Sequence, residues 1–217
     1  MVGAAAGPVI CTDRVAARHP SVPRGALTGS ASDGAAGDRL RYLGAYPADL
    51  QAQVLSLVDG GRLADHLRKR YPQAHSVRSD RALFQYVNAL RQSRLRASDP
   101  VDKVLYDSKI RVIQQALGLH TAHARVQGNR LKASREIRIA SMFREAPPEF
   151  LSMIVAHELA HLKEREHGKA FYQLCQHMEP RYHQLEFDVR LYLTHLDLGG
   201  ERLWVADAGG SLPKSEQ

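Results

Sequence analysis

Two histidines four residues apart, with a glutamate directly after the first, form the segment His157-Glu158-Leu159-Ala160-His161. Residues at this spacing lie on one face of a helix, so both imidazoles can reach a single metal ion. Glu158 then lies beside the metal, close enough to accept a proton from a water molecule. The segment predicts the metal site of a zinc hydrolase, with His157 and His161 as ligands and Glu158 as the general base.

A catalytic zinc ion takes about three protein ligands and keeps one position open for water. His167 supplies a third imidazole, provided that the helix ends between Leu162 and His167, and Gly168 favours such an end. Glu186, on a later predicted helix, is the alternative third ligand, because some zinc proteases use a downstream glutamate. We favour His167 and keep Glu186 as the alternative.

Zinc (Zn²⁺) in this site lowers the pKa of its water, and Glu158 takes the proton as hydroxide attacks a carbonyl carbon. The expected function is a zinc-dependent metallopeptidase acting on a peptide or protein. The alternative is a metal-dependent hydrolase of a non-peptide amide. Four neighbouring side chains could stabilise the oxyanion, and for each of them a purely structural role is favoured. They are Tyr172, His177, Tyr182 and His183.

The metal-binding segment lies in an apolar stretch that begins with Pro147-Pro148-Glu149, a typical first helical turn. Before it, apolar residues at helical spacing predict helices over Pro47–Val58, over Arg62–Tyr71, from Ser79-Asp80 onward and from Asp99-Pro100 to Gly118. After it, helices are expected over Lys169–Met178 and Arg181–Leu196.

Between residues 119 and 143 the periodicity changes to that of strands. Leu119–Val126 and Arg130–Phe143 alternate in polarity, and Gln127-Gly128-Asn129 between them is a hairpin turn signal. We therefore expect an α+β fold with a small antiparallel sheet packed on the metal helix. Arg135–Ser141 is the candidate edge strand that could pair with an extended peptide.

These patterns divide the chain into four segments. Residues 1–38 are rich in Ala, Gly, Ser and Pro and are expected to form a disordered tail. Residues 39–117 form a helical region, residues 118–199 the catalytic core, and residues 200–217 a C-terminal tail. Neither a membrane-spanning run nor a signal peptide is evident, and Cys11 and Cys175 form no disulfide framework, so a cytoplasmic protein without membrane association is expected.

Charge is uneven along the chain. Residues 39–156 carry twenty Lys and Arg against ten Asp and Glu, a net charge of +10, whereas residues 157–217 carry seven against ten, a net charge of −3. The positive surplus predicts at most weak, non-specific nucleic acid binding, because no recognition motif accompanies it. Oligomeric state does not follow from the sequence.

The motifs together resemble those of the YgjP-like metallopeptidases. The matching segments are Phe143–Leu151, Ile154–Leu162, His167–Phe171 and Met178–Pro180, with Tyr182 beyond them. The resemblance covers about residues 100–197. It implies a zincin-like core and places the family's third zinc ligand at His167. The family's Trp-Gly-Ser-Cys segment is absent here, and the helical region 39–117 replaces a β-rich N-terminal part. The His167-Gly168 element with Phe171 also resembles SprT/Spartan proteases, which act on DNA-bound proteins; this makes a Spartan-like DNA-associated protease a further alternative.

Overall fold

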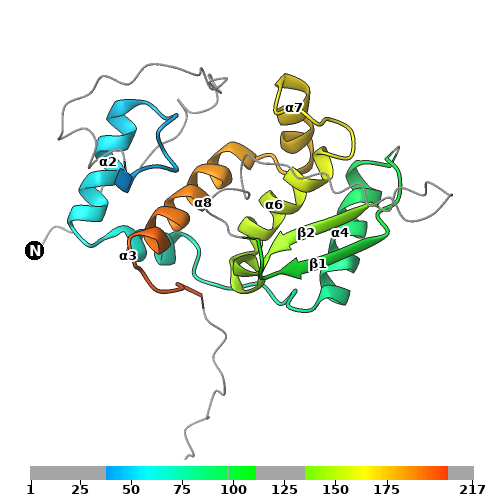
Figure 1. Ribbon diagram of the computed structural model, residues 1–217, viewed down its shortest axis with the longest axis horizontal. Helices are drawn as coiled ribbons and strands as arrows, with labels where there is room; N and C mark the ends of the chain where they lie inside the picture. The colour runs from blue at the N-terminus through cyan, green and yellow to red at the C-terminus, as the bar shows by residue number, and fades with distance from the viewer. Residues whose placement is uncertain (1–37, 97, 111–134, 205–217) are drawn as a thin grey trace, which may run out of the picture. The chain divides into compact units, whose positions relative to one another are not determined.

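The computed structural model describes residues 38–96, 98–110 and 135–204. They fall into two compact units, one containing residues up to 70 with residues 152–201, the other containing residues 71–151 with the chain from residue 202. Helices and a pair of strands make up the described chain, so the predicted α+β class is confirmed (Figure 1). Within these residues no helix is long and apolar enough to cross a bilayer.

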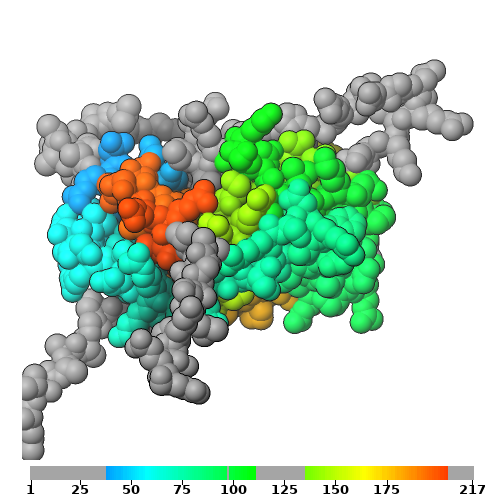
Figure 2. Space-filling model, turned by 90° about the horizontal axis from the view of Figure 1, so that it is seen from below, coloured from blue at the N-terminus to red at the C-terminus, as the bar shows by residue number. Residues whose placement is uncertain are grey.

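The first unit is helical and is organised around α8 (Tyr182–Asp197). Ten of the sixteen residues of α8 are buried, so neighbouring segments cover most of its surface. α3 (Leu63–Arg70) packs on α8, and α2 (Ala48–Asp59) packs on α3. Figure 2 shows α2 and α3 in cyan beside the orange surface of α8. α7 (Lys169–Met178) also contacts α8, as the amphipathic spacing of Phe171, Cys175 and Met178 requires.

Two acidic residues are buried on α8, and each has an arginine partner within the first unit. The Asp188 carboxylate lies 3.3 Å from Arg70 Nε, and the Glu186 carboxylate accepts a hydrogen bond of 2.9 Å from Arg190. Arg190 also donates to the backbone carbonyl of Tyr42 at 3.2 Å. Paired in this way, the buried charges fix how the N-terminal segment lies on α8, because a buried carboxylate without a partner would be strongly destabilising.

The second unit contains a two-stranded sheet. β1 (Lys103–Asp107) pairs with β2 (Glu136–Ala140), with Lys103 opposite Glu136 and Asp107 opposite Ala140. α4 (Asp80–Arg94) packs on β1 and buries Leu83 and Val87. A short 3-10 helix, η2 (Ser141–Glu145), follows β2 directly, and α6 (Pro148–Ala160) begins three residues later.

The predicted antiparallel sheet is wrong, because β1 and β2 run parallel. Parallel strands need a long crossover, and β1 lies where the sequence predicted a helix from Asp99-Pro100 to Gly118. Val104 and Leu105 form an apolar run too short to separate helix from strand by periodicity. The predicted hairpin at residues 127–129 lies outside the described residues. The packing of the sheet on the metal helix stays a prediction.

Most predicted helices are confirmed. α2, α3, α4, α7 and α8 match their predicted segments to within a few residues at each end. Ser79 caps α4 as expected: its hydroxyl accepts a hydrogen bond of 3.1 Å from the Ala82 N–H. The end of α2 at Gly60-Gly61 also follows the prediction, and Gly61 adopts a φ of 62°, which favours glycine.

The folded part of the chain continues beyond Gly200, where the sequence predicted a tail. A tail was expected from residue 200, but Trp204 is buried in the second unit. Its indole N–H donates to the Tyr71 carbonyl at 2.6 Å, and its ring meets the edge of Phe150. Of the predicted tail of residues 1–38, the structure describes only Asp38, and the domain boundary at residue 117 lies outside the described residues.

Candidate metal centre

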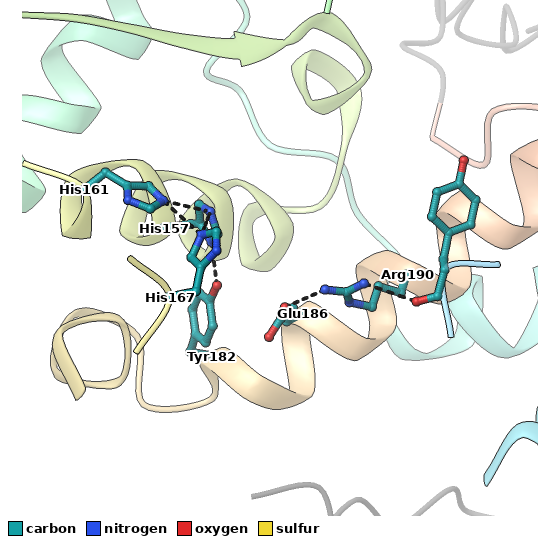
Figure 3. Close-up of polar contacts among 7 residues, drawn as sticks. His157, His161, His167, Tyr182, Glu186 and Arg190 are labelled. Carbon is teal, nitrogen blue, oxygen red and sulfur yellow. Dashed lines mark hydrogen bonds and ion pairs between the residues drawn. The ribbon is translucent and has the colours of Figure 1, made fainter. Parts of the chain in front are cut away.

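Three histidine side chains converge in the first unit. The Nε2 atoms of His157 and His161 lie 3.3 Å apart, those of His157 and His167 3.4 Å apart, and those of His161 and His167 3.1 Å apart (Figure 3). His157 lies in the last turn of α6, and His161 follows the end of that helix. The structure thus brings together the three imidazoles that the sequence singled out.

The triangle of nitrogen atoms has the dimensions of a metal site. Four ligands arranged tetrahedrally at about 2.0–2.1 Å from zinc are separated from one another by about 3.3–3.4 Å. Neutral imidazole is also a ligand that zinc, copper, iron and nickel accept. Three Nε2 atoms this close repel one another if all present lone pairs, unless a cation lies between them. The donor set and its geometry therefore fit a metal ion held by His157, His161 and His167.

The loop after α6 positions two of the three imidazoles, those of His161 and His167. α6 ends at Ala160, and turns follow in which the Lys163 and Glu164 N–H groups donate to the Ala160 carbonyl. The helix therefore ends before His167, as the sequence required, but at Ala160 and so two residues ahead of the predicted interval from Leu162 to His167. His161 Nδ1 lies 2.9 Å from the Glu164 carbonyl oxygen. A carbonyl only accepts, so Nδ1 of the neutral ring carries the hydrogen and Nε2 carries the lone pair that a metal would bind.

Tyr182 and Phe171 support the cluster from the helices that follow it. The Tyr182 hydroxyl lies 2.7 Å from His157 Nδ1, and both side chains are buried. The buried ring of Phe171 contacts all three imidazoles, with centroid distances of 5.0 Å to His157, 4.4 Å to His161 and 4.6 Å to His167. These contacts restrict rotation of the three rings, so much of the site's geometry is set by packing.

Glu158 is the carboxylate next to the first ligand in α6. Burial raises the pKa of Glu158 to about 7, because an ionised carboxylate loses hydration in an apolar setting. A cation held by the neighbouring histidines would oppose this effect and favour the ionised form. The role of Glu158 as proton acceptor of the site stays a prediction from the sequence.

Glu186, the alternative third ligand, is placed elsewhere. Its buried carboxylate points along α8 to Arg190 and forms an ion pair of 2.9 Å with it (Figure 3). The structure assembles His167 with His157 and His161 and leaves Glu186 out of that group. A carboxylate already neutralised by a guanidinium has little capacity left for a metal.

The side chains that the sequence suggested for oxyanion stabilisation differ in their surroundings. The ring of Tyr172 lies 6.4 Å from that of His167 and 5.5 Å from that of His183, whereas His177 is exposed on α7. Tyr182 contacts His157, so it orients one of the three imidazoles. This role was not predicted from the sequence, although the place of Tyr182 in the family motif was a signal for it. Oxyanion stabilisation by Tyr172, His177 or His183 stays a prediction.

Two comparisons relate the chain to known proteins. The model of the YgjP-like family, described as a metallopeptidase domain, matches residues 72–189. The match begins earlier than the resemblance noted from the motifs, so α4 and β1 lie within the matched domain. The chain is 58% identical over 164 residues to a UTP pyrophosphatase of Escherichia coli (strain K12), covering 76% of this chain and 98% of that protein. No solved structure matches significantly.

Proposed function

The chain belongs to the YgjP-like metallopeptidase family, and from this premise we propose that it is a zinc-dependent pyrophosphatase that hydrolyses UTP. The observation that carries the proposal is the 58% identity to the Escherichia coli UTP pyrophosphatase over 98% of its length. Family membership by itself implies the broader class of metal-dependent hydrolases. The cluster of His157, His161 and His167 provides the ligands that such an enzyme needs.

The proposed reaction assigns a role to each part of the site. Zinc bound by the three imidazoles would act as a Lewis acid and provide a water molecule acidic enough to react at neutral pH. Glu158 would accept the proton of that water. The water oxygen bonds to the α-phosphorus of UTP, the bond from that phosphorus to the bridging oxygen breaks, and pyrophosphate leaves as UMP forms. Tyr182 and the Glu164 carbonyl would keep two of the imidazole rings in place.

A second candidate function is peptide hydrolysis. It is supported by the family description and by the arrangement of His157, Glu158 and His161. The same water and base could attack a peptide carbonyl carbon. Hydrolysis of a non-peptide amide and a Spartan-like activity on DNA-bound proteins are further alternatives from the sequence.

One set of assays separates these functions. The purified full-length protein is incubated with UTP, ATP or CTP, and separately with an unfolded protein, while UMP, pyrophosphate and peptide fragments are measured. We expect UMP and pyrophosphate from UTP, loss of this activity with a chelator, and recovery when zinc is returned. Cleavage of the unfolded protein without any turnover of UTP would contradict the proposal and favour the peptidase.

A further inference from the structure

A pocket of about 320 Å³ lies in the second unit, beyond the ends of both strands. Ser108 follows β1 directly and Ser141 follows β2 directly, and both line the pocket. Because the strands are parallel, their C-terminal ends meet at one edge of the sheet. This edge is where ligands commonly bind in parallel sheets, since the chain turns away from each strand there and leaves a crevice. The other lining residues are Tyr106, Arg144, Glu145 and Arg202.

The lining is positively charged. Two guanidinium groups, Arg144 and Arg202, face a single carboxylate, Glu145, so the pocket carries a net charge of +1. Arg202 lies 3.4 Å from Glu145, a distance at which the ion pair is weak, and the Arg202 side chain is 51% exposed. Within the described residues, Arg144 has neither a carboxylate partner nor a hydrogen bond. The pocket therefore has cationic donors that an anion can engage.

Arg144 is held in position by an aromatic ring. Its guanidinium carbon lies 5.0 Å from the centroid of the Tyr106 ring, a cation–π contact. Tyr106 is itself fixed, because its hydroxyl donates to the Val77 carbonyl at 2.7 Å and its N–H donates to the Asp80 carboxylate at 3.0 Å. A guanidinium that contacts a ring keeps its planar N–H groups available for two parallel hydrogen bonds to oxygen atoms.

The other side of the pocket is also fixed. Trp204, two residues after Arg202, is anchored by its hydrogen bond to Tyr71 and therefore restrains Arg202. The hydroxyls of Ser108 and Ser141 have no hydrogen-bond partner within the described chain, and each can donate to an anion. Asp107 directly precedes Ser108, but its carboxylate repels an anion in the pocket only weakly, because it is paired with Arg138 at 2.9 Å.

We propose that this pocket is a phosphate-binding site in which Arg144 and Arg202 bind the phosphate oxygens and Ser108 and Ser141 add hydroxyl donors. A phosphate group offers three or more acceptor oxygens and up to two negative charges, which suits two guanidinium groups and two hydroxyls better than a planar carboxylate does. The phosphate belongs to a nucleotide or to its pyrophosphate product; this last step rests on the proposed function.

Binding measurements on the full-length, metal-containing protein test the proposal. Pyrophosphate, inorganic phosphate and UMP are titrated by calorimetry into the wild type and into Arg144→Gln, Arg202→Gln and Arg94→Gln. Arg94 is exposed on α4 and does not line the pocket, so its variant controls for the loss of one positive charge. We expect pyrophosphate affinity to fall at least tenfold in the two pocket variants, to stay within twofold of wild type in Arg94→Gln, and to recover in part in Arg144→Lys.

Unchanged pyrophosphate affinity in both Arg144→Gln and Arg202→Gln would overturn the site. Equal affinity of the wild type for pyrophosphate and inorganic phosphate would overturn its assignment to a nucleotide, whereas a preference for pyrophosphate of about fivefold or more supports it. UTP hydrolysis is measured in parallel. If pyrophosphate binding depends on the two arginines but UTP is not hydrolysed, the phosphate site stands and the proposed function fails. If UTP is hydrolysed but pyrophosphate binds equally well without the arginines, the proposed function stands and the phosphate site fails.

Discussion

The hydroxyl of Tyr182, at the first residue of α8, lies 2.7 Å from Nδ1 of His157 in α6. For His157 to offer Nε2 to a metal as a neutral ring, Nδ1 must carry the hydrogen and donate it to the Tyr182 oxygen. Burial raises the pKa of the Tyr182 phenol well above its ordinary value, so the group stays neutral and can accept this bond. We therefore expect Tyr182 to be a positioning residue, which selects the tautomer of His157 without contacting the metal.

Tyr182→Phe removes the hydroxyl and keeps the ring. We expect the variant to fold and to bind zinc about 10- to 100-fold more weakly than the wild type, the usual effect of losing a partner of a metal-bound histidine. Competition with a chromophoric chelator measures the affinity, and circular dichroism checks the fold. Tyr192→Phe, on the same helix, is the matched control. Wild-type affinity in Tyr182→Phe would show that packing alone orients His157.

His167→Ala is expected to lose tightly bound zinc, whereas Glu186→Ala is expected to retain it. Removing His167 takes away one of the three imidazoles that are proposed to hold the metal. Removing Glu186 breaks a buried ion pair with Arg190, which should lower the free energy of unfolding by about 3 kcal/mol or more without touching the metal. Zinc content of the folded protein by mass spectrometry, together with urea denaturation, separates the two effects. Loss of zinc from folded Glu186→Ala, with zinc kept in His167→Ala, would reverse the assignment.

Glu158→Gln is expected to retain one zinc ion per chain and to lose hydrolysis by at least about a hundredfold. Glutamine has almost the same shape as glutamate but cannot accept the proton of the water. Turnover of UTP and metal content are measured on the same preparation. Glu164→Gln is the control, because Glu164 supplies only its backbone carbonyl to His161. Wild-type turnover in Glu158→Gln would remove Glu158 from the reaction.

The parts that could be predicted from the sequence are those fixed by local spacing. Because His157 and His161 are four residues apart, they lie on the same face of a helix. Gly168 indicates the loop that brings His167 close to them. β1 could not be predicted in this way, because its pairing with β2 joins residues about thirty positions apart in the sequence. For the same reason the proposed phosphate pocket could not be predicted from the sequence, because Arg144 and Arg202 come together only in the fold.

Trp204→Ala tests whether the chain after Gly200 stabilises the fold. We expect the free energy of unfolding to fall by about 3–5 kcal/mol, because a large buried ring and its hydrogen bond to the Tyr71 carbonyl are lost together. Leu198→Ala is the control and should change stability by no more than about 0.5 kcal/mol, since Leu198 is exposed. Urea denaturation measures both variants. Equal stability of Trp204→Ala and the wild type would mean that residues 201–204 contribute nothing to the fold.

The net charge of +10 over residues 39–156 should give weak DNA binding at low salt, because basic side chains release counterions from the phosphates. Several of these side chains already have carboxylate partners, among them Arg39 with Asp59 and Arg138 with Asp107, which leaves fewer charges for DNA. We therefore expect affinity for a labelled duplex, followed by fluorescence anisotropy, to collapse between roughly 50 and 200 mM salt. Binding that persists at physiological salt, or cleavage of an unfolded protein that increases when DNA is added, would contradict this expectation and favour a Spartan-like protease.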